Sequence, residues 1–176
     1  MKRDQDEDVQ WEYQFYPTPP ELAAELVALA DIGPEDIVLE PSAGQGGLLR
    51  EIAKYHPARI ECCELMFENR VVLREQGWEV VGKDFLALDT YARYTRIVAN
   101  PPFSNDQDMR HVRHMYALLG FGGVMVVVMS AKFLESALDE HRAFREWLEA
   151  RQAIIEPLGV GAFDAIGVDV ATTLVI

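Results

Sequence analysis

The sequence predicts an α/β fold, an open sheet of seven mostly parallel strands with helices on both faces. Two observations carry this prediction. Short apolar runs alternate along the chain with segments in which apolar residues recur at helical spacing. The clearest of these runs, 124–129, is apolar at every position, as in a strand that is buried on both faces of a parallel sheet. Ligands of such sheets bind at the carboxyl ends of the strands, so the residues that follow each run are the first site candidates.

Composition favours a single domain. The 176 residues are 49% hydrophobic and 26% charged, which suits one buried core and is short for two. Residues 1–12 are predicted to be an acidic, disordered tail, and residues 13–176 one domain. No apolar run approaches the roughly 20 residues of a membrane span, and the polar N-terminus is unlike a signal peptide. We therefore expect a cytoplasmic protein without membrane contact.

The expected helices and strands follow from the spacing of apolar residues and from the positions of glycine and proline. A helix should begin near Pro20, because proline suits a first turn, and end near Gly33-Pro34. Further helices are expected over 48–54, 68–76, 109–119 and 139–150. Strands are expected over 37–40, 59–64, 78–82, 96–99, 124–129 and 168–176, with the stretch 154–157 between the last two.

The two cysteines, Cys62 and Cys63, are adjacent in an expected strand. Neighbouring residues of a strand point to opposite faces, which suits neither a disulfide nor a metal site. Reduced, structural thiols are expected, and no metal.

A strand, glycine loop and helix follow one another from Ile37 to Lys54, with the loop after Glu40. Such a turn lets a ligand approach the backbone and the N–H groups of the helix N-terminus, but many cofactor folds share it. The sequence lacks the Lys-Ser/Thr ending of a Walker A loop. Glu64 follows about 20 residues later, at the spacing of a carboxylate that binds a ribose diol, although a solvated strand end is the simpler alternative.

Two further strand ends offer candidate contacts. Asp84 can accept from the amino group of an adenine and Phe85 can pack on its ring; a helix cap and a core residue are equally good alternatives. Asn100-Pro101-Pro102-Phe103 combines fixed backbone acceptors, a side-chain carbonyl and an aromatic face, which suits an aromatic amine. The alternative is a Pro-Pro turn with Phe103 packed in the core.

These motifs together resemble the S-adenosylmethionine-dependent N6-adenine methyltransferases over residues 13–176. The matching elements are Phe15 to Pro20, Glu40 to Gly46, Glu64, Asp84-Phe85, Asn100 to Phe103 and the loop at Phe163. The resemblance implies a Rossmann-like class I methyltransferase fold and S-adenosylmethionine as cofactor. It implies cofactor contacts by Tyr16, Thr18, Glu40, Pro41, Ser42, Ala43, Gly44, Gly46, Glu64, Leu65, Asp84, Phe85 and Asn100. Asn100, Pro101, Pro102 and Phe103 would be catalytic, and Phe103 and Phe163 would stack on an adenine flipped out of the duplex.

The sequence also departs from that family. No separate target-recognition domain is expected, and Asp164 follows Phe163 where a phosphate contact would favour a basic residue. The net charge of −13 predicts weak, salt-sensitive nucleic-acid binding unless a partner subunit helps. Candidate basic contacts are Arg110 within the run 110–114, and Lys132, His141, Arg142 and Arg145, although such a run is often a solvated helix face.

DNA is the first expected substrate. An adenine in structured RNA, a protein glutamine amide, or a role as a non-catalytic cofactor-binding subunit remain alternatives.

Overall fold

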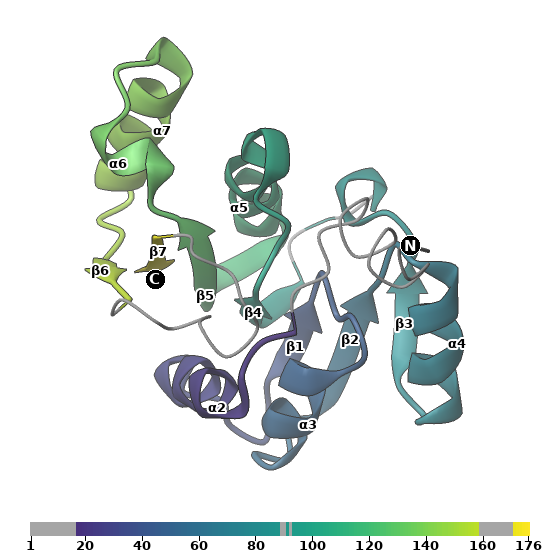
Figure 1. Ribbon diagram of the computed structural model, residues 1–176. Coiled ribbons are helices and arrows are strands. Elements are labelled where there is room, and N and C mark those ends of the chain that lie inside the picture. The colour runs from purple at the N-terminus through teal and green to yellow at the C-terminus, as the bar shows by residue number, and fades with distance from the viewer. Residues whose placement is uncertain (1–16, 89–90, 92, 159–170) are drawn as a thin grey trace, which may run out of the picture.

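The computed structural model describes residues 17–88, 91, 93–158 and 171–176. In this part of the chain seven strands form one sheet in the order β3-β2-β1-β4-β5-β7-β6 (Figure 1). The strands are β1 Ile37–Glu40, β2 Arg59–Cys63, β3 Glu79–Gly82, β4 Tyr94–Ala99, β5 Leu119–Ser130, β6 Ile155–Pro157 and β7 Thr172–Val175. The strands from β3 to β5 pair in parallel, whereas β7 is antiparallel to both β5 and β6. The prediction of a mostly parallel, seven-stranded α/β sheet is confirmed.

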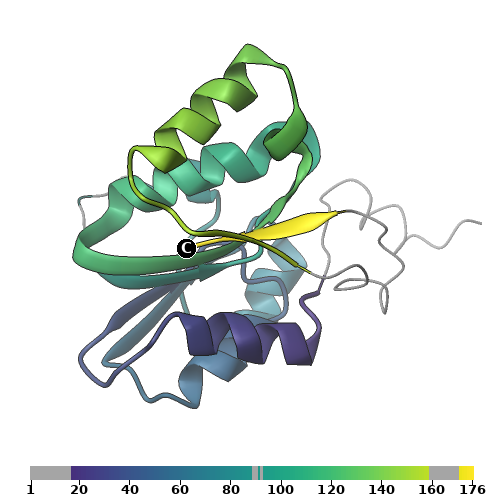
Figure 2. The ribbon, with the colours of Figure 1, turned by 90° about the vertical axis from the view of Figure 1, so that its left-hand side faces the viewer.

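Helices cover both faces of this sheet, as Figures 1 and 2 show. The helices are α2 Pro20–Leu29, α3 Gly47–Ala53, α4 Phe67–Glu75, α5 Gln107–Leu118, α6 Lys132–Glu135 and α7 Asp139–Glu149, with 3-10 turns η1 Phe85–Ala87 and η2 Ser104–Asp106. Helices α2, α3 and α4 pack on one face, and α5, α6 and α7 on the other.

Alternating side chains of the strands supply both cores. Val98 and Val126 pack with α2 and α3, whereas the adjacent Ile97 and Val127 pack with α5 and α7. The cysteines follow the same alternation: both are buried free thiols, and they belong to different clusters on the two faces. Because successive strand residues point in opposite directions, a sheet covered on both sides needs the continuous apolar runs seen in the sequence.

The structure differs from the expected elements in three places. Strand β5 begins at Leu119, which pairs with Tyr94, and residues 120–123 form an irregularity that shifts the register before Val124. The short helix α6 was not predicted, because four residues show no helical periodicity. Helix α2 ends at Leu29, earlier than the expected end near Gly33-Pro34. The expected start of the last strand at 168–170 lies outside the described residues.

Candidate active site

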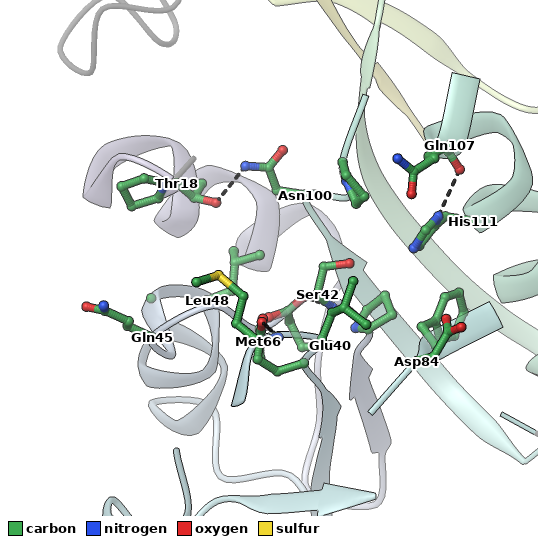
Figure 3. Close-up of a pocket in the computed structure, with 18 of the residues that line it drawn as sticks. Thr18, Glu40, Ser42, Gln45, Leu48, Met66, Asp84, Asn100, Gln107 and His111 are labelled. Atoms are coloured by element: carbon green, nitrogen blue, oxygen red, sulfur yellow. Dashed lines mark hydrogen bonds between the residues drawn. The ribbon is translucent and has the colours of Figure 1, made fainter. Parts of the chain in front are cut away.

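A cavity of about 390 Å³ lies at the carboxyl ends of β1, β2, β3 and β4. This volume is that of a small-molecule site. Figure 3 shows Thr18 and Gln45 toward one end of the cavity and Asp84 and His111 toward the other. The predicted site residues that line it are Thr18, Glu40, Pro41, Ser42, Ala43, Glu64, Leu65, Asp84, Phe85, Asn100 and Pro102. Most of the predicted site residues thus lie together, because the carboxyl ends of parallel strands meet at one edge of the sheet.

Glu40 ends β1 in the wall of this cavity with only 1% of its surface exposed. Its Oε1 accepts a hydrogen bond from the backbone N–H of Ser42 at 2.9 Å. Burial raises the pKa of Glu40 to about 8; the Ser42 bond lowers the pKa and the nearby Glu64 raises it. The Glu40 carboxyl group is therefore largely neutral at pH 7, and a cation bound beside it would favour its charged form.

Glu64 holds the glycine loop in place. Its Oε2 accepts from the backbone N–H of Gly44 at 2.7 Å, and its Oε1 accepts from the backbone N–H of Met66 at 2.7 Å. The side chain is buried, which raises its pKa, so Glu64 is not a solvated strand end. Each carboxylate oxygen has a further lone pair. The predicted ribose contacts would therefore add to two existing backbone bonds.

The predicted glycines Gly44 and Gly46 are not among the residues that line the cavity. Both have positive φ, 53° and 83°. A Cβ on Gly46 would lie 3.2 to 3.3 Å from atoms of Gln76, Leu73 and Trp78, so this glycine packs toward α4 and β3. The two glycines shape the loop, while their neighbours Ala43, Gln45 and Gly47 face the cavity.

Asp84 and Phe85 have the structural roles that were named as their alternatives. Asp84 caps η1, because its Oδ1 accepts from the backbone N–H of Leu86 at 3.0 Å. Phe85 is 3% exposed and belongs to the core. Its ring lies 5.3 Å from that of His111 and 4.8 Å from that of His114, measured between centroids. Both Asp84 and Phe85 nevertheless line the cavity.

Asn100 follows β4 and joins two segments that are distant in the sequence. Its Nδ2 donates to Oγ1 of Thr18 at 3.1 Å, which fixes the orientation of the amide (Figure 3). Pro102 lines the cavity, whereas Pro101 is buried and is not part of the lining. Phe103 is half-buried against the cluster that contains Val98 and Val126, as its structural alternative predicted.

Within the run 110–114, only Arg110 and Arg113 are exposed. His111 and Val112 are buried, and Arg113 stacks over the rings of Phe144 and Trp147 at 5.3 and 4.9 Å. Arg110 alone of the run is an exposed cation without such packing. A helix turns by about 100° per residue, so consecutive basic residues point in different directions.

The other basic candidates are engaged locally. Lys132 and the buried His141 both contact Asp106, at 3.0 and 3.1 Å. Arg142 pairs with Asp139 at 2.6 Å, and Arg145 donates to two backbone carbonyl oxygens. A basic groove built from these side chains would require them to leave their present partners.

Two predicted site residues, Tyr16 and Phe163, lie outside the described residues, as does Asp164, so their roles stay predictions. Conversely, the cavity is lined by residues that were not among the individually predicted site residues. These are Pro17, Gln45, Gly47, Leu48, Arg50, Met66, Lys83, Leu86, Gln107 and His111. Gln107 and His111 are one helical turn apart on α5, a spacing that places two side chains on one face.

The described residues also show two absences. They contain no group of three or more His, Cys, Asp or Glu side chains that could hold a metal ion. Among the described helices, none combines the length and the apolar character needed to cross a membrane.

Solved structures of similar fold were then compared with this geometry. The M protein of the type I restriction enzyme EcoKI superposes with a TM-score of 0.71 and 20% identity, over 92% of this chain and 43% of that one. The 23S rRNA methyltransferase ErmE superposes with a TM-score of 0.60 and 17% identity, over 92% of this chain and 69% of that one. The TYW2 protein of P. horikoshii, solved in complex with MeSAdo, superposes with a TM-score of 0.63 and 15% identity, over 92% of this chain and 62% of that one. The fold is that of a class I methyltransferase.

The methyltransferase fold is shared at these low identities without a match in sequence. No protein-family model matches the chain, and no curated protein matches it. The chain spans less than half the length of the EcoKI M protein. The agreement therefore concerns the Rossmann-like fold alone.

Proposed function

We propose that this protein transfers a methyl group from S-adenosylmethionine to the exocyclic N6 amine of adenine in DNA. One observation carries the proposal. Asn100 and Pro102, from the motif suited to an aromatic amine, line the same cavity as Glu40, Glu64 and Asp84, the expected cofactor contacts. A methyl donor and an amine acceptor bound by these two sets would share one site.

The cavity suits an elongated, positively charged nucleoside. The buried carboxyl group of Glu40 would gain a counter-charge from the ammonium of the methionine moiety near Thr18 and Ser42. Glu64 would accept from the ribose hydroxyls, with Leu65 beside it. Asp84 and Phe85 would bind the adenine at the opposite end, where Figure 3 places Asp84. When bound, the cofactor supplies an electrophilic sulfonium methyl group.

The contribution of the chain to the reaction is positioning. The Thr18 bond holds the Asn100 amide in one orientation at the end of β4. The Asn100 side-chain carbonyl and the Pro101 backbone carbonyl would accept the two amine hydrogens and so direct the nitrogen lone pair at the methyl group. Such preorganised contacts lower the barrier without a covalent intermediate. Phe103 and Phe163 would stack on the target base.

A second candidate function is methylation of adenine in structured RNA. The superposition on an rRNA methyltransferase favours it, whereas the superposition on the M protein of a restriction enzyme favours DNA. A partner subunit that binds the nucleic acid is part of the proposal, because most basic candidates on the described surface already have local partners. A protein glutamine amide and a non-catalytic subunit are further outcomes of the test.

The test offers cofactor with a tritiated methyl group to DNA, structured RNA and protein fractions. We expect label in DNA, recovered as N6-methyladenine after hydrolysis. Label in RNA or protein alone would move the substrate to that class. Cofactor binding by calorimetry without label in any fraction would indicate a binding subunit, and no cofactor binding would contradict the proposal as a whole.

A further inference from the structure

His111 is a buried side chain of α5 that faces the cavity and has no role in the assignments above. It is 6% exposed and lines the cavity with Asp84 and Phe85. In Figure 3 its ring extends from α5 toward the end of the cavity at Asp84. A buried histidine is commonly a core residue, but this one both packs against Phe85 and lines the cavity.

One ring nitrogen of His111 is fixed by the backbone. Nδ1 lies 2.8 Å from the carbonyl oxygen of Gln107, which can only accept, so Nδ1 carries the hydrogen and donates it. Burial lowers the pKa of His111, which favours the neutral ring at pH 7. In a neutral ring with hydrogen on Nδ1, Nε2 has a lone pair and accepts.

The cavity end at Asp84 thus presents two acceptors from different elements. Asp84 follows β3, and its Oδ1 already accepts from Leu86 as a cap. Asp84 and His111 are close enough for the charge on Asp84 to act on the imidazole. A planar amine with two hydrogens matches a pair of acceptors, whereas an oxo group in the same position meets two lone pairs and is repelled.

We propose that His111 is a specificity-determining residue, which accepts a hydrogen bond through Nε2 from the 6-amino group of the cofactor adenine and works with Asp84 to reject purines that carry a 6-oxo group. This inference rests on the proposed cofactor site and extends it to α5. Helix α5 follows the Asn100 loop directly, so the segment that orients the target amine also reads the cofactor base.

The test compares two ligands and three variants by calorimetry. The ligands are S-adenosylhomocysteine and its deaminated analogue S-inosylhomocysteine, which differ at position 6 of the purine. Wild type should prefer the adenosyl ligand, and His111→Phe should reduce that preference about tenfold, the equivalent of one hydrogen bond. His111→Gln, which returns an acceptor oxygen, should restore part of it.

His114→Phe is the matched control. His114 also packs on Phe85 from α5, but its Nε2 contacts the carbonyl oxygen of Leu88 and it does not line the cavity. This variant should keep the full preference for the adenosyl ligand. An equal loss in His114→Phe would assign the effect to packing around Phe85 and overturn the inference.

A measurement on the wild-type protein tests the same inference without requiring that the variants fold. The nitrogen-15 resonance of His111 Nε2 should shift on addition of the adenosyl ligand and stay in place with the inosyl ligand. Adenosyl binding with no shift and an unchanged preference in His111→Phe would overturn the role of His111 and leave the cofactor site intact. Failure of wild type to bind the adenosyl ligand would contradict the proposed function itself, and the inference with it.

Discussion

Glu40 and Glu64 are carboxyl groups on adjacent strands that face one cavity and are nearly inaccessible to water. Burial raises the pKa of each, and the proximity of Glu64 further raises that of Glu40. The carboxyl group of Glu40 is therefore largely neutral in the folded protein, at the place where the ammonium group of the proposed ligand would lie. A buried, perturbed carboxyl group in a cavity wall is typical of a functional site.

Glu40→Gln should change how stability depends on pH. Between the ordinary pKa of 4.5 and the folded value of about 8, the folded protein keeps a proton that the unfolded chain has released. Glu40 therefore stabilises the fold at low pH, and this contribution is lost as pH rises through that window. Removing it should flatten the decline of the unfolding free energy by about 1.4 kcal/mol per pH unit. Urea unfolding at pH 5 to 8 measures this, with the exposed Glu35→Gln as control; equal slopes would contradict the burial argument.

Asn100→Ala should separate catalysis from cofactor binding. Deleting a preorganised polar contact of this kind commonly lowers the rate about 10² to 10³-fold. The affinity for S-adenosylhomocysteine should change much less than the rate, because the side-chain amide is assigned chiefly to the target amine. Thr18→Val, which removes the partner of Nδ2, should give a smaller loss of rate through a less ordered amide. Full activity of Asn100→Ala in a labelling assay would exclude the proposed chemistry.

At the scale of elements, the start of α3 depends on the left-handed backbone conformation of Gly46. Gly46 caps α3 in the left-handed region, at φ 83°, where an L-residue costs about 1 to 2 kcal/mol. Gly46→Ala should lower the free energy of unfolding by at least that amount, because its Cβ also meets neighbours at 3.2 to 3.3 Å. Gly47→Ala is the matched control: its nearest neighbour would be 4.0 Å away, and alanine favours the helix. Equal melting temperatures of the two variants would contradict this account.

Some features of the helices and strands could be predicted from the sequence, and others could not. Strand ends were predictable, since apolar runs stop at Glu40, Glu64 and Asn100 and parallel strands bring their carboxyl ends together. The contribution of His111 was not, because the rotation of a helix about its axis depends on packing that the sequence does not state. For the same reason the run 110–114 suggested a basic surface, although Arg113 packs on Trp147.

At the scale of the whole molecule, the net charge of −13 opposes the proposed binding to nucleic acid, which is also negatively charged. Arg110 is an exposed cation of α5 that does not pack on an aromatic ring as Arg113 does, so it is the expected phosphate contact. Arg110→Ala should weaken binding to all sequences alike and reduce the salt slope by about 1. Arg113→Ala, on the same helix, should leave both unchanged. Binding titrations over a range of salt concentrations test this, and identical slopes for wild type and Arg110→Ala would place the contact elsewhere.

The order of strands at the end of the sheet has a consequence for how the chain acquires its structure during synthesis. Strand β6 is made before β7, yet its neighbour in the sheet is β7, which separates it from β5. While the ribosome still holds the residues of β7, β6 therefore has no partner and the edge of β5 stays open. We expect backbone amides of β6 to exchange freely in stalled nascent chains whose C-terminal linker leaves β6 outside the ribosome and β7 inside it, and to become protected once a longer linker brings β7 out. Protection in the shorter chains would mean that β6 first pairs with a different strand.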